Sequence, residues 1–166
     1  MPSADSLYSL RPLRIAFTYD SKSEWLALGY SVDQCAKLDS DEAIEQVAMS
    51  LRKIGDVEMV GGLKSLTKIV ATSKPDWDIV FNICEGLGSL GREAQVPALL
   101  EGWGIPFTFS DSATMALCLD KAKTKVSKSI APLLTPVFRW SWSTTVFPSH
   151  LSPASHPEIC ALHYLS

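Results

Sequence analysis

A loop rich in glycine and charge is the part of this sequence best suited to chemistry. Gly86, Gly88 and Gly91 have the spacing G-x-G-x-x-G, directly after an apolar run and before a helical pattern. In dinucleotide-binding proteins such glycines let backbone amides approach a pyrophosphate at a helix N-terminus, and an acidic residue further on binds the ribose. Asp111 lies beyond the loop at a suitable separation for that role. The loop is therefore a candidate dinucleotide site.

Three features weaken the dinucleotide hypothesis. The fingerprint normally opens the first βαβ unit, whereas this loop follows the third predicted strand. Glu85 places negative charge beside the proposed phosphate. Pro97 predicts a late helix start, over about 97–102, because an interior proline costs about 3 kcal/mol. A tight turn at a sheet edge, with Arg92 and Glu93 as solvated charges, explains the same residues, and both alternatives stay open.

The distribution of histidine and cysteine limits which other chemistry is available. No histidine precedes His150, so acid–base chemistry in the body of the chain needs carboxylates, lysines, tyrosines or thiols. The three histidines at the C-terminal end match no common ligand spacing, and no metal site is expected. The cysteines form no C-x-x-C pair, which favours reduced, buried thiols in a cytoplasmic protein. They are Cys35, Cys84, Cys118 and Cys160.

Length and composition predict one globular domain of ordinary size. The chain has 166 residues, of which 46% are hydrophobic and 20% charged, and its net charge is −3. This balance gives no reason to expect nucleic acid or an anionic membrane as a partner. No apolar run approaches the roughly 18 residues of a membrane span, and no secretory leader is expected.

Apolar periodicity predicts alternating strands and helices. Strands are expected over residues 13–19, 57–60 and 78–83, and helices over 39–54 and 63–72, with a second short strand and a lysine-rich helix after the glycine loop. The alternation predicts an α/β fold, a three-layer parallel sheet with flanking helices and right-handed crossovers. Ligands of such sheets lie beyond the carboxyl ends of the strands, where the glycine loop falls.

Local signals set the expected boundaries of the first long helix. Asp39 and Glu42 have the spacing of a capping box, with Asp39 as the cap, and Gly55 can end the helix. The preceding segment, 20–38, is expected to be a long polar connection without regular structure.

Four motifs between Asp78 and Lys125 carry a family resemblance. They read D-I-V-F-N-I-x-E-G, G-R-E-A-Q-V-P-A-L-L-E, G-I-P-F-T and A-L-C-L-D-K-A-x-T-K. In this order they resemble the N-terminal domain of the D-alanine–D-alanine ligase family, in the ATP-grasp superfamily. The resemblance implies a Rossmann-like domain that precedes an ATP-grasp fold and contributes to the site of an amino acid such as D-alanine. It also implies a reaction in which ATP and Mg²⁺ activate a carboxylate as an acyl phosphate that an amine then attacks.

The resemblance also implies roles for particular residues. The loop that faces the substrate corresponds to Glu85, Gly86, Gly91, Arg92 and Glu93. Many members have a histidine where this chain has Glu85, so a histidine role does not transfer.

The resemblance gives weaker support for the roles of two further residues, Lys121 and Glu24. Lys121 corresponds to a lysine that reaches the nucleotide phosphates, a task suited to a compact cation. The alternative for Lys121 and the lysines that follow it is a solvated helix face. Glu24 is only a positional candidate for the substrate glutamate of the family, whose motif is absent. No catalytic residue and no metal ligand is assigned.

The resemblance ends near residue 139. The expected organisation is a ligase-like α/β domain over 11–125, the start of a linker over 126–139, and an unrelated, irregular and poorly ordered tail over 140–166. Phosphoryl transfer needs a metal and positioned cations, so no ligase activity and no tight ATP binding are expected from this chain alone. A second hypothesis is a stand-alone interaction module that associates through exposed aromatic residues of the tail. These are Trp140, Trp142, Phe147 and Tyr164.

Overall fold

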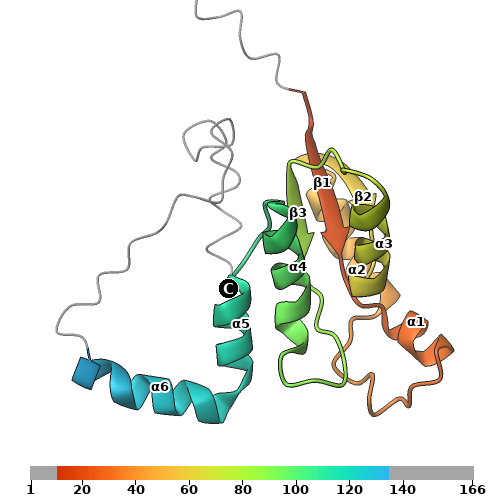
Figure 1. The fold of residues 1–166 in the computed structure, drawn as a ribbon. Helices are drawn as coiled ribbons and strands as arrows, with labels where there is room; N and C mark the ends of the chain where they lie inside the picture. The colour runs from red at the N-terminus through yellow and green to blue at the C-terminus, as the bar shows by residue number, and fades with distance from the viewer. Residues whose placement is uncertain (1–10, 135–166) are drawn as a thin grey trace, which may run out of the picture.

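The described part of the chain, residues 11–134 of a computed structural model, contains a three-stranded parallel sheet with helices on both faces (Figure 1). The strands are β1 (Leu13–Thr18), β2 (Gly55–Met59) and β3 (Ile79–Asn82), in the order β2-β1-β3. The helices are α1 (Lys22–Ala27), α2 (Asp41–Leu51), α3 (Leu63–Thr72), the 3₁₀ helix η2 (Arg92–Ala94), α4 (Gln95–Trp103), α5 (Ser112–Leu119) and α6 (Lys121–Leu134). The predicted parallel α/β architecture is confirmed.

The central strand, β1, separates two apolar cores because successive side chains of a strand point to opposite faces. Ile15 and Phe17 face α2, where they pack with Ile44 and other residues of that helix. Ala16 faces the other side and belongs to the core of α3 and α4, which includes Leu66 and Leu100. These two cores hold the strand ends, and the loops that follow them, in fixed positions.

A fourth extended segment lies beside β3. Val80 forms a parallel bridge with Phe107, its N–H donates to the Pro106 carbonyl at 2.8 Å, and its own carbonyl accepts from Thr108 N–H at 2.9 Å. The predicted second short strand is therefore a single bridge. The chain order reverses between β1 and β3, and in open parallel sheets ligands bind in the crevice at such a point.

The prediction that residues 20–38 lack regular structure was wrong for the first part of that segment. Residues 22–27 form α1, and the Ser21 hydroxyl caps it by accepting from Glu24 N–H. The helix is short and has no buried residue, so it left no apolar periodicity in the sequence.

The predicted ends of α2 were also wrong. Ser40, not Asp39, is the cap, and its hydroxyl accepts from Ala43 N–H at 3.2 Å. Asp39 forms a bridge with Ser21, so its backbone is extended and stands outside the helix. Gly55 does not end the helix, which stops at Leu51; it opens β2 opposite Leu13.

The predicted start of α4 at Pro97 was late by two residues. The helix begins at Gln95, directly after η2, so Pro97 lies in its first turn. Amides of the first turn have no partner within the helix, and proline there loses no hydrogen bond. Gly104, with φ of 65°, ends the helix in the left-handed conformation.

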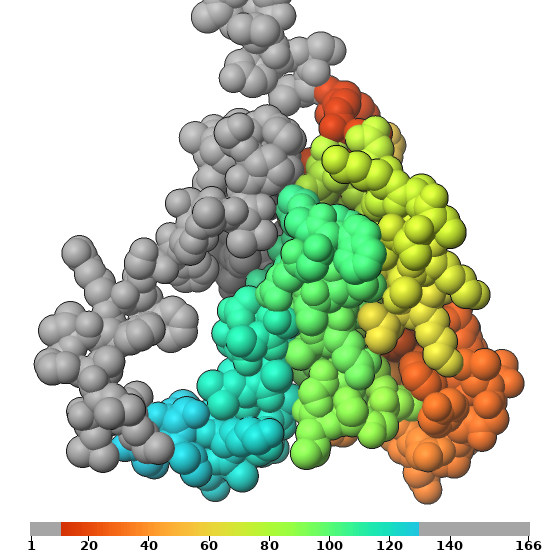
Figure 2. Space-filling view, viewed as in Figure 1, coloured from red at the N-terminus to blue at the C-terminus, as the bar shows by residue number. Residues whose placement is uncertain are grey.

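The last two helices extend along one side of the molecule. Figure 2 shows α4 between α3 and the α5–α6 segment, in agreement with the contacts of α4 with both α3 and α5. The expected domain boundary at residue 125 falls within α6. The expected tail over 140–166, with its histidines, its aromatic residues and Cys160, lies outside the described residues. None of the helices within 11–134 has the length and apolar character needed to cross a lipid bilayer.

Candidate functional site

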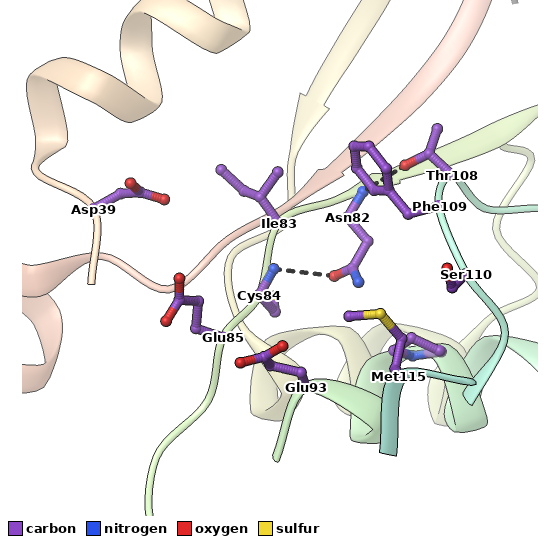
Figure 3. A pocket seen from close by; sticks show the side chains of 11 residues that line it. Asp39, Asn82, Ile83, Cys84, Glu85, Glu93, Thr108, Phe109, Ser110 and Met115 are labelled. Atoms are coloured by element: carbon purple, nitrogen blue, oxygen red, sulfur yellow. Dashed lines mark hydrogen bonds between the residues drawn. The ribbon is translucent and has the colours of Figure 1, made fainter. Parts of the chain in front are cut away.

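A cavity of about 260 Å³ lies at the carboxyl edge of the sheet, beside the point where the chain order reverses (Figure 3). Its walls come from segments far apart in sequence: Asp39, residues 82–85 at the end of β3, Glu93 and Pro97, residues 108–110, and Met115 on α5. The position agrees with the expectation for ligand sites in parallel sheets.

Asn82 joins the end of β3 to β1 and to the segment after Phe107. Its side-chain Oδ1 accepts a hydrogen bond from the Thr18 hydroxyl at 2.9 Å and another from Cys84 N–H at 3.2 Å. Its backbone N–H donates to Thr108 Oγ1 at 3.2 Å. The ends of β1 and β3 and the segment after Phe107 are thereby linked, which fixes one wall of the cavity.

The glycine loop is anchored by a carboxylate of the chain itself. Gly86 N–H donates to Asp20 Oδ2 at 2.8 Å, and the other oxygen of Asp20 accepts from Trp25 Nε1 at 3.1 Å. Gly86 has φ of 61°, and a Cβ there would lie 3.1 Å from Cβ of Arg92, so the turn strongly favours glycine.

This arrangement gives the dinucleotide hypothesis no support. The first amide of the fingerprint already binds Asp20. Both carboxylate oxygens of Asp111 are used by Thr114, whose N–H and hydroxyl donate to them at 2.9 and 2.8 Å. Asp111 is the cap of α5, a structural role that the spacing alone could not distinguish from ribose binding.

The cavity carries an excess of negative charge. Asp39, Glu85 and Glu93 all line it, and Arg92 forms an ion pair with Glu93, at 3.0 Å. Burial raises the pKa of Glu85, and the nearby carboxylates of Glu93 and Asp39 raise it further, whereas the positive charges of Arg92 and Lys37 offset part of the rise. Within residues 11–134, Glu85 has no ion-pair partner. A ligand with a positive charge would therefore stabilise the ionised form of Glu85.

The thiol of Cys84 is not suited to nucleophilic chemistry. It is buried beside the cavity, and burial, with the charge of Asp20, raises its pKa far above the ordinary thiol range. The thiolate is the reactive form, so Cys84 acts as a small apolar residue. Cys35 and Cys118 are also free thiols.

The structure separates the residues that were predicted for the substrate-facing loop. Glu85 and Glu93 line the cavity. Arg92 holds Glu93, and Gly86 holds the turn against Asp20. Gly91 has an ordinary φ of −109° and precedes η2 without lining the cavity.

The two weaker predictions fall elsewhere. Glu24 lies on α1 and Lys121 opens α6, and neither lines the cavity. Lys121 is exposed, as are Lys123, Lys125 and Lys128, which agrees with a solvated helix face.

Asn82 and the wall from Thr108 to Ser110 were missed by the sequence reasoning. A polar residue that ends an apolar strand was the available signal for Asn82, because a buried amide needs partners. Phe109 has φ of 73°, which is rare for a residue with a side chain, and its ring packs edge-on to Phe81 at 5.4 Å. Nothing in the sequence marked that conformation.

The fit of the described residues to ATP and Mg²⁺ is poor. Within 11–134 no group of three or more histidine, cysteine, aspartate or glutamate side chains is placed to hold a metal ion. Lys121 offers one exposed cation at the start of α6, and Lys123 next to it is paired with Asp120 at 3.3 Å. These residues do not form a nucleotide–metal site by themselves.

Several curated D-alanine–D-alanine ligases are similar in sequence to the chain. The D-alanine–D-alanine ligase of Xanthomonas axonopodis pv. citri is 36% identical over 70 residues, which are 42% of this chain and 21% of that ligase. The ligase of Marinobacter nauticus is 32% identical over 111 residues, 67% of this chain and 32% of its own length. The ligase of Chlorobium limicola is 26% identical over 151 residues, 76% of this chain and 42% of that protein. The chain is a relative of the D-alanine–D-alanine ligases.

The relationship to D-alanine–D-alanine ligases is partial in both directions. The chain spans only about a fifth of the length of the first relatives and 42% of the Chlorobium limicola ligase. This is consistent with a match to the N-terminal domain of the ligases alone. No protein-family model matches the chain. The resemblance to D-alanine–D-alanine ligases predicted from the four sequence motifs is confirmed.

Proposed function

We propose that residues 11–134 form the substrate-side domain of a ligase of the D-alanine–D-alanine type, a Rossmann-like domain that precedes an ATP-grasp fold in a cytoplasmic protein. The observation that carries the proposal is the acidic cavity at the carboxyl edge of the sheet. Most of its walls come from residues 82–115, within the segment that resembles the ligases.

In this proposal the cavity binds the ammonium group of an amino acid such as D-alanine. Glu85 is the principal partner, because it is partly buried and has no ion-pair partner within the described chain. An ammonium group beside it offsets the repulsion from Glu93 and Asp39, which line the same cavity. An uncharged ligand of the same shape leaves this repulsion in place.

The described residues bind and orient the amino acid, and they do not carry out the phosphoryl chemistry. In the ligase family ATP and Mg²⁺ supply the activation of a carboxylate as an acyl phosphate. Lys121 contributes one cation toward the nucleotide in a complete ligase. Because the described residues offer no metal site of their own, we propose that the 166-residue chain alone is catalytically incomplete.

Titration of the purified 166-residue chain tests both parts of the proposal. We expect D-alanine to bind, as measured by calorimetry or amide chemical-shift changes, and D-lactate, which has a hydroxyl in place of the ammonium, to bind at least about tenfold more weakly. In the presence of ATP, Mg²⁺ and D-alanine, we expect no ADP and no dipeptide.

Controls separate charge from site. Glu85→Gln should weaken D-alanine binding, because the ammonium group loses its charged partner. Asp56→Asn removes the same unit of charge from an exposed position on β2 that does not line the cavity. It should leave D-alanine binding unchanged. Equal binding of D-lactate and D-alanine would contradict the ammonium site, and ADP formation that depends on D-alanine would contradict catalytic incompleteness. If the chain is instead a stand-alone interaction module, neither ligand binds.

A further inference from the structure

The side-chain NH₂ group of Asn82 lies in the cavity wall and has no hydrogen-bond acceptor within residues 11–134. Asn82 is only 5% exposed, and it lines the cavity. Within residues 11–134 its Oδ1 has two hydrogen-bond donors, whereas its Nδ2 has no acceptor. Buried amide groups are normally paired, so an unpaired one beside a cavity indicates a ligand or an ordered water.

The hydrogen bonds of Oδ1 determine which way the amide points. Cys84 N–H is a backbone group that can only donate, so the atom 3.2 Å from it must be the oxygen. The Thr18 hydroxyl donates to the same oxygen at 2.9 Å, from the end of β1. The NH₂ group therefore faces away from both partners, toward the cavity, as Figure 3 shows.

The cavity thus combines a donor at one position with carboxylates at others. A ligand that is only a cation satisfies Glu85 but leaves the two N–H donors of Asn82 unpaired. A ligand that has both an ammonium group and an oxygen satisfies both. Amino acids and their close analogues have this combination.

We propose that Asn82 is a specificity-determining residue that donates to an oxygen of the amino-acid ligand while the ligand's ammonium group lies at Glu85. This inference rests on the proposed function of the cavity and adds the feature that orients the ligand within it. The oxygen can belong to the α-carboxylate or to a side-chain hydroxyl, and both accept the same hydrogen bond.

Asn82→Asp is the variant that removes the NH₂ donor. Aspartate has the same shape, and one of its oxygens still accepts from Thr18 and from Cys84 N–H. The substitution also adds a carboxyl group whose charge would itself repel a ligand carboxylate, so a loss of preference is interpreted together with the side-chain resonances of wild-type Asn82, which carries no added charge. Thr18→Val is the matched control, because it removes a hydrogen bond to Asn82 from inside the core and leaves the NH₂ group in place.

The measurement is the affinity of the 166-residue chain for three ligands: D-alanine, D-serine, and isopropylamine, which is D-alanine with a methyl in place of the carboxylate. If the carboxylate is the acceptor, the wild type prefers D-alanine to isopropylamine by at least about tenfold, and Asn82→Asp abolishes this preference. If a hydroxyl is the acceptor, the preference concerns D-serine over D-alanine and is lost in the same variant. Thr18→Val keeps the preference in either case.

The ratio of affinities distinguishes a specific role of Asn82 from a structural one, because a loss of folded protein weakens the binding of all three ligands together. If wild type binds the three ligands equally, or if Asn82→Asp keeps the preference, the role of Asn82 is overturned while the ammonium site at Glu85 stands. If none of the three binds to wild type, the proposed function itself fails.

A second measurement needs no stable variant. The side-chain NH₂ resonances of Asn82 in the ¹⁵N-labelled wild type should shift on addition of the preferred ligand and remain unchanged with isopropylamine. Unchanged resonances with all bound ligands would overturn the proposal.

Discussion

Asp78, at the amino end of the sheet, is paired within the described part of the chain, whereas Glu85 and Asp39, at the carboxyl end, are not. At the amino end, Asp78 is 8% exposed and accepts two hydrogen bonds from the Arg11 guanidinium, at 2.6 and 2.8 Å, and one from Arg14 N–H at 2.8 Å. At the carboxyl end, Glu85 and Asp39 line a cavity and have no ion-pair partner within residues 11–134.

The pKa shifts follow this difference. Burial alone would raise the pKa of Asp78, but the hydrogen bonds from Arg11 and Arg14 outweigh it and hold the pKa below its usual range. Burial and neighbouring carboxylates raise the pKa of Glu85. A carboxylate that is fully paired within the chain supports the fold, whereas one that the fold leaves unpaired is available to a ligand.

Asp78→Ala should give the largest effect on stability. The substitution leaves Arg14 N–H and the Arg11 guanidinium without their acceptor, and we expect a loss of about 2 kcal/mol in the free energy of unfolding by urea. Arg11 is 53% exposed, so water can hydrate it and the loss stays at the lower end for a broken buried pair.

Asp76→Ala is the control for Asp78→Ala. Asp76 pairs with Arg14 but is 79% exposed, and exposed pairs contribute little. The ratio of D-alanine to isopropylamine affinity should be unchanged in both variants. If Asp76→Ala lost as much unfolding free energy as Asp78→Ala, the burial of Asp78 would not be the reason for its contribution to stability.

Glu85→Gln should weaken ligand binding without reducing stability, the reverse of Asp78→Ala. We expect the affinity for D-alanine to fall at least about tenfold, because the ammonium group loses its charged partner. Stability should not fall, since the substitution removes a charge that the fold disfavours. Calorimetric titration and urea unfolding of the same sample measure the two effects, and a stability loss comparable to that of Asp78→Ala would refute the contrast.

Gly86→Ala should cost about 1–2 kcal/mol of stability, because the residue has a positive φ and a Cβ would crowd Arg92. Gly88→Ala is matched to it: Gly88 also has a positive φ, of 88°, but no atom lies within 4 Å of the position of its Cβ. Only Gly86→Ala should also weaken D-alanine binding. Equal effects of the two variants on binding would mean that the Asp20–Gly86 contact does not position Glu85.

The smallest effect concerns pH. The lowered pKa of Asp78 means that its contribution to stability is present at neutral pH and is lost as the pH falls through that lowered value. Glu85 has the opposite sign: its ionisation destabilises the fold as the pH rises through its raised pKa. Urea unfolding across pH should show a shallower acid loss in Asp78→Asn than in wild type. Identical pH profiles for the two proteins would contradict the assignment of the shift to Asp78.

Local sequence signals were sufficient for most of the fold. The helix over residues 63–72 was predicted with its observed bounds, because Leu66 and Val70 lie on one apolar stripe. The cap of α2 was misassigned because Asp39 and Ser40 are both good caps, and only the bridge between Asp39 and Ser21 decides between them. Asn82 was missed because its hydrogen-bond partner on β1 is remote in sequence.

The sequence by itself determined the order of strands and helices and the ligase relationship, since apolar periodicity and contiguous motifs are local properties. It also marked Glu85 and Glu93 as residues of interest. Only the tertiary structure decided which polar groups are paired and which face the cavity. The contacts that decide it, Arg11 with Asp78, Thr18 with Asn82 and Asp20 with Gly86, join residues more than 60 positions apart. The parallel sheet brings these pairs together, because it places the ends of β1 and β3 side by side.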